Sequence, residues 1–378
     1  FKIMKITDVT KKFIQENSDA NVHEVALKSA NYPEIDIPFA LQQIVGRKKI
    51  KSKIPTFYVN QNIIYPPKIS LEQTSSEATA RYKAALCKGK IFIDLTGGFG
   101  CDCYFISQNF QQAYFVEYNE ELCGTAMHNF EALHAENINV ICSKAEDYIL
   151  KIKEKVDLIY LDPARRSNTG SKTVLIADCT PNVAEMVDLL LSKSSTVLIK
   201  LSPLIDISAA MKELKYVSEV HVLAVDNECK EVLLLLKNER VDFVTINAVN
   251  LHNEREKECF SFKLIDESRI EVFFADRLKK YLYEPNNAIL KAGAFKILTH
   301  RFEIKKLDIS THLYTSDQIL ENFPGRVFRI EEIIPFSKQG IKSLKLKFSK
   351  ANVTVRNFPL TVPEIRAKTG LKEGGDVY

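Results

Sequence analysis

The sequence predicts an α/β protein whose central domain is a mostly parallel β-sheet with crossover helices. Between Lys90 and about residue 238, short apolar runs rich in β-branched residues alternate with segments of helical spacing. The seven runs are IFIDL, AYFVEY, INVIC, DLIYLD, TVLIKL, EVHVLAV and EVLLLL, which together predict a seven-stranded sheet. Such apolar runs are typical of strands buried on both faces. The last two flank Asp226 and Asn227, which favour a tight turn, so the sheet should close with a hairpin-like pair.

Regions of different character flank this domain. A chain of 378 residues is long enough for two or three domains. Residues 1–75 contain one glycine, Gly46, and show helical spacing in Asn21–Ala30 and Pro38–Val45, which predicts a helical region. The sheet domain should occupy residues 76–240, and two small α+β modules should follow, at 241–322 and 323–378. The first has strand-like runs in FSFKLI, IEVFFA and RFEIKKL and helical pieces near Pro285–Ile297 and Ser316–Asn322. Position 1 is Phe, so both chain ends are taken as provisional.

The composition excludes several classes of protein. Hydrophobic residues make up 46% of the chain, which excludes disorder throughout. No run approaches the ~18 apolar residues of a membrane span, and the beginning, FKIMKITDVTKKF, lacks the apolar core of a signal peptide. Eight cysteines at irregular spacings predict neither a disulfide framework nor a zinc site, and seven scattered histidines have no ligand spacing. We therefore expect a cytoplasmic protein with no metal and no membrane contact; the oligomeric state stays open.

The charges point to local contacts with a polyanion. Lys and Arg total 52 against 48 Asp and Glu, a formal net charge of only +4. Residues 323–378, however, contain 11 Lys and Arg against 5 Asp and Glu. There, alternation in Ser343–Ser349 predicts a strand with lysines on one face, either an edge strand protected from pairing or a surface for a polyanion. A second basic stretch is either a solvated face or a phosphate-contacting patch, and comprises Arg47, Lys48, Lys49, Lys51 and Lys53.

A glycine-rich turn follows the first predicted strand. The sequence Asp94-Leu95-Thr96-Gly97-Gly98-Phe99-Gly100 leads from the strand into a helix, and its glycines let a ligand approach the backbone closely. Dinucleotides and S-adenosylmethionine both bind at such turns. A dinucleotide fingerprint has G-x-G-x-x-G after the strand, whereas here an acid ends the strand and the glycines follow as D-L-T-G-G-F-G. The spacing therefore favours S-adenosylmethionine, with Asp94, Thr96, Gly97, Gly98 and Gly100 as its binding residues.

Further acids extend the predicted cofactor site. Glu117 ends the next strand, 23 residues after Asp94, where a carboxylate can accept the ribose hydroxyls of either cofactor class. Tyr118 follows it directly. Asp102 either caps the helix after the turn or lies near the methionine amino group. After INVIC, either Glu146 or Asp147 is expected at the adenine ring.

The fourth strand ends in Asp162-Pro163-Ala164-Arg165-Arg166, and from here the order of motifs resembles class I S-adenosylmethionine-dependent methyltransferases. The resemblance implies a Rossmann-like fold and gives Asp162 and Pro163 the catalytic role of orienting an acceptor nitrogen. The amino-methylating branch has a second proline and an aromatic residue where this chain has Ala164 and Arg165, so a base nitrogen is a plausible acceptor among others. Arg165 and Arg166 are candidates for substrate binding or for ion pairs that fix the loop. Lys200, at a strand end, either contacts substrate or pairs with a loop acid.

The resemblance extends over most of the chain. An ordered set of motifs is similar to one bacterial family of class I methyltransferases with a C-terminal ferredoxin-like segment and a THUMP-like domain; the set comprises Glu72–Lys83, DLTGGFG, DPARR, Asp178–Pro181, Lys200–Pro203 and Asn227–Glu231. Tyr281–Asn286 and Lys291–Gly293 resemble its ferredoxin-like segment, and Phe323 onward its THUMP-like domain. The resemblance implies methyl transfer to RNA, such as tRNA or rRNA. The alternatives are a methyltransferase acting on a small molecule or protein, and a noncatalytic RNA-binding protein with a degenerate fold.

Overall fold

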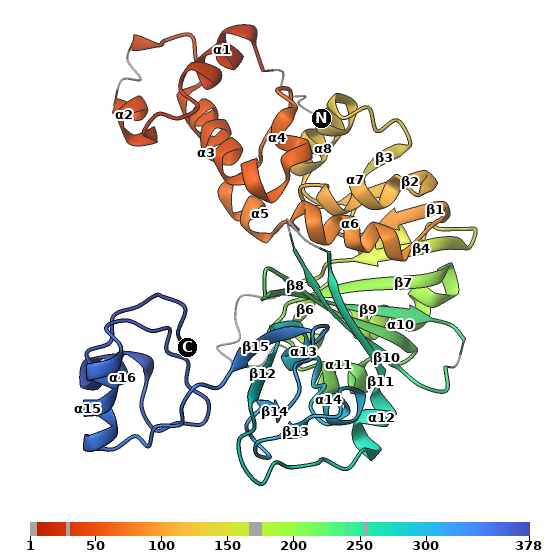
Figure 1. Ribbon diagram of the computed structural model, residues 1–378. Coiled ribbons are helices and arrows are strands. Elements are labelled where there is room, and N and C mark those ends of the chain that lie inside the picture. The colour runs from red at the N-terminus through yellow and green to blue at the C-terminus, as the bar shows by residue number, and fades with distance from the viewer. Residues whose placement is uncertain (1–5, 28–30, 166–175, 240, 253–255) are drawn as a thin grey trace. The chain divides into compact units, whose positions relative to one another are not determined.

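The chain folds into two compact units, residues 1–264 and residues 265–378 (Figure 1). The structure is a computed structural model that describes residues 6–27, 31–165, 176–239, 241–252 and 256–378. The first unit holds a large sheet and the helices that precede it, and the second holds a small antiparallel sheet and further helices.

The N-terminal region is helical, as the sequence predicts. Its helices are α1 (Asp8–Glu16), α2 (Val22–Leu27), α3 (Ile37–Lys53), α4 (Pro55–Val59) and α5 (Lys68–Gln73). Asp36 caps the start of α3: its carboxylate accepts a hydrogen bond from the Phe39 backbone N–H at 3.1 Å and so satisfies one of the unpaired donors of the first turn. Apolar side chains of α1 and α3, including Phe13, Ile14 and Ile44, form a separate small core.

The central sheet contains all seven predicted strands. They are β1 (Gly89–Asp94), β2 (Phe110–Glu117), β3 (Ile138–Cys142), β4 (Val156–Leu161), β7 (Ser194–Leu201), β8 (Val217–Val225) and β9 (Glu228–Lys237). The strand order is β11-β10-β8-β9-β7-β4-β1-β2-β3. β1, β2, β3, β4 and β7 pair in parallel, and β9 is antiparallel to both β7 and β8. The carboxyl ends of β1, β2, β4 and β7 therefore meet at one edge of the sheet.

The turn between β8 and β9 is the expected hairpin. Val225 pairs with Glu228, and the two residues between them, Asp226 and Asn227, have φ values of 48° and 64°. These left-handed conformations match a two-residue turn that follows the twist of the strands.

The sheet continues beyond residue 240, where the sequence placed the domain boundary. β10 (Thr245–Leu251) pairs in parallel with β8, and β11 (Glu258–Lys263) pairs antiparallel with β10, which gives nine strands. Phe260 and Phe262 alternate with polar residues and are buried, so β11 covers the core with one face. The compact unit accordingly ends at Leu264.

Helices and short elements connect the strands. They are α6 (Glu77–Leu86), α7 (Cys101–Ser107), α8 (Glu120–Ala132), α9 (Ala145–Ile149), β5 (Ala164–Arg165), the 3₁₀ turn η2 (Ile176–Asp178), β6 (Cys179–Thr180), α10 (Val183–Lys193) and α11 (Ile207–Glu213). α6 packs beside α7, and α9 beside α10. β5 and β6 form a separate antiparallel pair next to the end of β4.

The second unit is built on a four-stranded sheet of order β13-β14-β12-β15. Its elements are α12 (Leu264–Arg269, which starts one residue before the unit), β12 (Tyr281–Pro285), α13 (Asn287–Ala292), α14 (Ile297–Arg301), β13 (Lys305–Lys306), β14 (Tyr314–Ser316), β15 (Gly325–Arg329), α15 (Lys338–Lys347) and α16 (Val362–Thr369). The helical piece predicted near Pro285–Ile297 is present, but Ser316–Asn322 is not helical, and IEVFFA contributes only a single bridge from Phe274 to Lys306.

The predicted lysine-bearing strand at Ser343–Ser349 is wrong, because this segment lies largely in α15. Ser337 caps the helix by accepting a hydrogen bond from the Gly340 N–H at 3.2 Å. Leu and Lys are strong helix formers, so the five alternating residues do not outweigh the cap and the propensity. The change moves the lysines from a strand face to a helix surface.

Candidate active site at the carboxyl edge of the sheet

The turn after β1 is closed by hydrogen bonds within the predicted cofactor loop. Asp94 Oδ1 accepts the Thr96 backbone N–H at 3.0 Å, and the Gly100 N–H donates to the Gly97 carbonyl at 3.0 Å. Asp94 is only 1% exposed, and this burial raises the pKa of its carboxyl well above the usual range. The Asp94 carboxylate therefore shapes the turn from within.

Each glycine of the turn has its own physical reason. A Cβ on Gly97 would lie 2.3 Å from the ring of Phe115, so the close packing of the turn on β2 requires glycine there. Gly98 and Gly100 have φ values of 56° and 87°, which favour glycine. A Cβ on Gly98 would meet only the Thr96 carbonyl oxygen, at 3.9 Å, so the side of Gly98 is open. Such a turn can receive a ligand against its backbone.

Glu117, at the end of β2, contacts the same turn. Its Oε2 accepts the Gly98 N–H and its Oε1 accepts the Asn119 N–H, both at 2.9 Å. These bonds fix the carboxylate at the edge of the sheet beside the open glycine. Tyr118 is 73% exposed, and Glu146 and Asp147, in the first turn of α9, are exposed and make no hydrogen bond to the described residues. The structure therefore gives Glu117 a fixed position and leaves the other three side chains at the surface.

Asp162 joins the predicted catalytic loop to the cofactor loop. Its backbone N–H donates to Thr96 Oγ1 at 2.6 Å, so the residue after β4 is tied directly to the glycine turn. Its carboxylate Oδ2 accepts a hydrogen bond from Lys200 Nζ at 2.5 Å. Pro163, which follows, is buried. The structure thus brings Asp162, Thr96 and Lys200 together, and it realises the ion pair that the sequence offered as one role for Lys200.

Lys200 is the more buried member of the Asp162–Lys200 pair. The Lys200 side chain is 11% exposed and that of Asp162 is 35% exposed. Burial raises the pKa of Asp162, with Lys200 acting in the opposite direction. For Lys200 burial favours the neutral amine, but Asp162, Asp102 and Glu231 outweigh it and raise its pKa, so Lys200 stays an ammonium ion.

The two arginines of the loop are less defined by the structure. Arg165 lies in β5, whose backbone pairs with Cys179 of β6. Arg166 lies outside the described residues. Their assignment to substrate binding stays a prediction.

Asp102 belongs to a buried polar cluster behind the turn. Its Oδ2 accepts hydrogen bonds from Ser75 Oγ and from the Tyr160 hydroxyl, both at 2.7 Å, and its Oδ1 forms an ion pair with Lys83 Nζ at 3.0 Å. Lys83 is completely buried and also donates to Ser75 Oγ at 3.0 Å and to Glu231 at 2.7 and 2.9 Å. Burial acts to raise the pKa of Asp102, but Lys83 and Lys200 together bring it below its usual value.

Sequence reasoning assigned Asp102 to the cofactor and did not assign functional roles to Lys83, Glu231, Ser75 or Tyr160. The sequence did contain a signal for a buried ion pair. Lys83 lies on the same apolar side of α6 as Ala80 and Ala84, and a charge on that side needs a buried partner. The motifs quoted for the family resemblance also contain Ser75, Lys83 and Glu231. Only the folded sheet shows that β9 supplies that partner.

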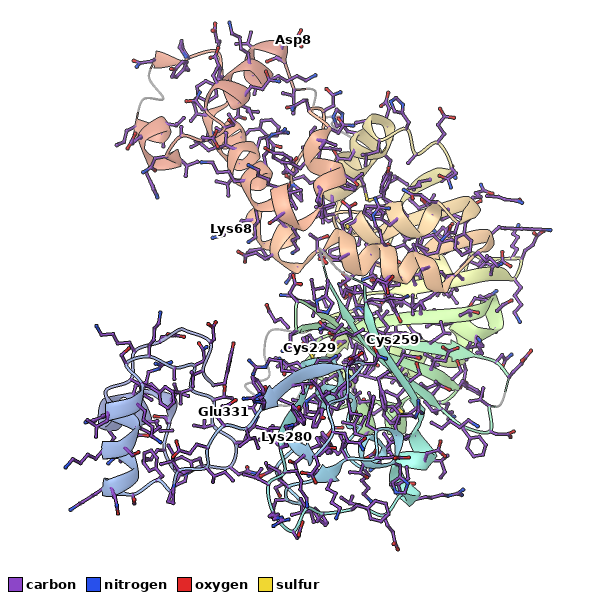
Figure 2. All side chains as sticks on the ribbon, in the orientation of Figure 1. Asp8, Lys68, Cys229, Cys259, Lys280 and Glu331 are labelled. Atoms are coloured by element: carbon purple, nitrogen blue, oxygen red, sulfur yellow. The ribbon has the colours of Figure 1, made fainter. Side chains whose placement is uncertain are left out.

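The basic stretch of α3 is partly used for internal contacts. Lys49 pairs with Glu72 at 2.5 Å, Lys53 Nζ donates to the carbonyls of Leu71 and Glu72 at 2.9 and 3.0 Å, and Arg47 lies over the ring of Tyr58 at 4.5 Å. A further cation, Lys68, lies at the start of α5 (Figure 2). Its Nζ is 3.9 Å from Glu72 Oε1. Burial, followed by repulsion from Lys200, lowers the pKa of Lys53.

The described residues provide no metal-binding group, no disulfide and no helix that could span a membrane. Among the described residues, no three His, Cys, Asp or Glu side chains are grouped so that they could hold a metal ion. The described cysteines form no disulfide. Likewise, the described helices include none with both the length and the apolar character needed to cross a membrane.

The arrangement at this edge suits a cationic adenosine cofactor. Gly98 leaves space beside the backbone that a Cβ would occupy, and the Glu117 carboxylate next to it can accept ribose hydroxyls. Asp162 is hydrogen-bonded to the same turn. The Glu117 carboxylate forms no ion pair with the described residues, so its negative charge complements a cationic ligand. The residues present therefore fit S-adenosylmethionine.

Family models match three successive parts of the chain. Residues 77–200 match "Conserved hypothetical protein 95", residues 281–324 a ferredoxin-like domain, and residues 325–378 a THUMP domain-like model. Comparison with curated protein sequences gives no significant match.

The solved structures that match include one over nearly the whole chain. The crystal structure of a "putative methyltransferase" from Porphyromonas gingivalis W83 is 33% identical, with a TM-score of 0.88 over 98% of this chain and 94% of that chain. An rRNA methylase from Streptococcus thermophilus is 16% identical, with a TM-score of 0.33 over 43% of this chain and 96% of its own. A "putative methyltransferase" from Streptococcus mutans in complex with SAH is 15% identical, with a TM-score of 0.32 over 42% and 95%. These last two carry no argument about the substrate. The first match and the three family models show that the chain belongs to the class I methyltransferase family with a C-terminal ferredoxin-like segment and a THUMP-like domain.

Proposed function

We propose that this protein transfers the methyl group of S-adenosylmethionine to RNA. The observation that carries the proposal is the hydrogen bond from the Asp162 N–H to Thr96 Oγ1, at 2.6 Å. It ties the loop expected to orient the acceptor to the turn expected to hold the cofactor. Transfer of a group between two bound molecules depends chiefly on such relative positioning.

The cofactor is held by the turn after β1 and by the end of β2. Gly98 leaves its side of the turn open to the cofactor, while Gly97 and Gly100 let the turn pack closely on the Phe115 and Phe130 rings. Glu117 accepts the ribose hydroxyls, and the Gly98 N–H and Asn119 N–H keep its carboxylate in place. Exposed Glu146 and Asp147 are available to the adenine amino group, and Tyr118 to the ring. When bound, S-adenosylmethionine supplies an electrophilic methyl group on a positively charged sulfur. Asp94 and Asp102 act behind this surface, through the turn and the start of α7.

RNA as the substrate is supported by the charge on the second unit. Helix α15 contains no acidic residue, and Lys338, Lys342 and Lys345 are exposed at i, i+4 and i+7, which places them on one face. Lys347, on another face, is neutralised by Glu332 at 2.6 Å. None of these three lysines forms an ion pair with the residues that the structure describes, and such a row of ammonium groups on a THUMP-like segment suits the phosphates of a polynucleotide.

A binding experiment tests the substrate class. We expect the chain to bind unfractionated tRNA or rRNA with an affinity that falls steeply with salt, because bound phosphates release counterions. The triple variant K338E/K342E/K345E should bind at least tenfold more weakly. A matched control, K151E/K153E/K155E, reverses the charge of three exposed lysines that precede the amino end of β4, away from the carboxyl edge that holds the candidate site. This variant should bind like the parent. Equal losses in both variants would mean nonspecific attraction and would count against the proposal.

The activity is tested by comparing nucleosides from cells with and without the gene by mass spectrometry, followed by transfer of isotope-labelled methyl to RNA from the cells lacking it. We expect one methylated nucleoside to disappear and to be restored by the protein but not by its D162A variant. Titration with S-adenosylmethionine in a calorimeter should show binding; no binding would favour a noncatalytic protein. Labelling of a protein or small molecule in place of RNA would overturn the substrate class. A base nitrogen as acceptor and a cytoplasmic location stay predictions from the sequence.

A further inference from the structure

Any acceptor that reaches Asp162 also meets an ammonium group. Lys200 Nζ donates a hydrogen bond to Oδ2 of the Asp162 carboxylate, whereas Oδ1 accepts no hydrogen bond from the described residues. Asp162 follows β4 directly, and Lys200 is the next-to-last residue of the adjacent parallel strand β7, in which Ile199 is paired with Leu161. The two side chains therefore leave the same edge of the sheet, so the acceptor contacts a carboxylate and a lysine together.

This pair discriminates between acceptor atoms by the charge that each develops. A neutral amine becomes positive as it receives a methyl group, so the carboxylate stabilises it but the adjacent ammonium opposes it. A hydroxyl oxygen instead becomes more negative as it loses its proton. An ammonium donor beside it then stabilises the transition state, and a carboxylate oxygen can take the proton.

The proton inventory of the site fits the second case. Lys200 remains protonated because Asp162, Asp102 and Glu231 all favour its charged form. It can donate a hydrogen bond to an oxyanion but cannot serve as a base. Lys83, fully buried between Asp102 and Glu231, compensates two of the nearby acids and keeps them in place. Asp162 Oδ1 is left as the proton acceptor.

We propose that the acceptor is a ribose 2′-hydroxyl of the RNA, in place of the base nitrogen expected from the sequence, and that it is held between Lys200 Nζ and Asp162 Oδ1. The inference rests on the proposed function, because the 2′-hydroxyl is the hydroxyl that each internal nucleotide of an RNA chain carries. The hydroxyl gives its proton to Asp162 Oδ1, and its oxygen forms a bond to the methyl carbon. The carbon–sulfur bond breaks with its electron pair remaining on sulfur, and Asp162 later releases the proton to water. Lys200 stays charged throughout.

The position of the methyl group decides the proposal. Labelled RNA from the transfer reaction is digested to nucleosides, and each is fragmented at the glycosidic bond in the mass spectrometer. We expect the label on the ribose fragment. A label on the base fragment would overturn the 2′-hydroxyl while the proposed function stands, and no label in any RNA would overturn the proposed function itself.

Variants of Lys200 give a second, independent arm. Loss of an oxyanion donor costs about 100-fold to 1000-fold in rate, so K200M should lose at least 100-fold in kcat. A nitrogen acceptor predicts an unchanged or higher rate, since a repelling charge has been removed. The matched control is K237M: Lys237 also forms one ion pair, with Glu219 at 3.7 Å, but lies at the far end of β9, opposite Thr196. It should keep its rate within about twofold.

A binding measurement tests the contact without turnover. In the presence of S-adenosylhomocysteine, the substrate RNA is compared with the same RNA carrying one 2′-deoxy nucleotide at the methylated position. The parent protein should bind the deoxy form several-fold more weakly, and this penalty should be smaller in K200M, because the variant has already lost the Lys200 contact and keeps only the contact with Asp162. A deoxy penalty as large in K200M as in the parent would show that Lys200 does not touch the hydroxyl and would refute its role.

Discussion

Replacing Lys83 by Met should destabilise the protein more than any other single lysine change that the structure suggests. The Nζ of Lys83 is inaccessible to solvent and contacts Asp102, Glu231 and Ser75 at 2.7–3.0 Å. Met has a volume similar to that of Lys, so the change creates little cavity. It does remove the cation that pairs with two buried carboxylates, Asp102 and Glu231. Removing one partner of a buried ion pair costs about 3–5 kcal/mol, and we expect a loss of that size in the free energy of unfolding.

The loss should depend on pH in a defined direction. The Lys83 and Lys200 ammonium groups, acting against burial, hold the pKa of Asp102 below its usual value. An acid with a lowered folded-state pKa contributes stability that is present above its unfolded pKa, about 4, and is lost as the pH falls through the folded pKa. The difference between parent and K83M should therefore be greatest near pH 7 and shrink on acidification.

Urea unfolding followed by circular dichroism measures both effects, since the chain has no tryptophan for fluorescence. The matched control is K230M: Lys230 is 41% exposed and pairs with exposed Glu228 at 2.7 Å, on the same strand as Glu231, so it should lose no more than about 1 kcal/mol. The double variant K83M/E231L removes one of the orphaned acids and should recover part of the loss. A K83M loss below about 1 kcal/mol, or one independent of pH, would refute the buried-pair reasoning.

Three further results are expected. G97A should lose about 1–3 kcal/mol of stability in thermal unfolding, because its methyl group would overlap the Phe115 ring, whereas a stability equal to that of the parent would contradict that packing. E117Q should bind S-adenosylmethionine about 10–100-fold more weakly by calorimetry, since it exchanges a charged acceptor for a neutral one; unchanged affinity would remove Glu117 from the site. Methyl transfer should fall on acidification as Asp162 becomes protonated. Burial and Asp102 raise the pKa of Asp162, whereas Lys200 and Lys83 lower it. Because K200M removes one of the lowering charges, it should move the acid limb of the rate profile to higher pH. An acid limb that does not move would mean that another group titrates.

The seven strands, the Asp226–Asn227 hairpin and the glycine turn are set by local patterns, namely apolar runs of strand length and residues that tolerate positive φ, and so were predictable. β10 and β11 were not assigned to the central sheet. Their apolar residues alternate with polar ones, a pattern that fits an edge strand of any sheet and so does not indicate which sheet they join. The strand expected at Ser343–Ser349 became α15, because five alternating residues specify less than a helix cap and helix propensity together.

The sequence alone determined which chemical groups reach the carboxyl edge: a strand that ends in a residue brings that residue there, as with Glu117 and Asp162. Only the tertiary structure decided what those groups contact. Lys83 and Glu231 are separated by 148 positions along the chain, and Asp162 and Lys200 by 38. Charge pairing acts over a few ångströms in space, and no local pattern encodes which distant strand will be the neighbour. The order of β1, β4, β7 and β9 in the sheet therefore selected the partners that give the site its charge.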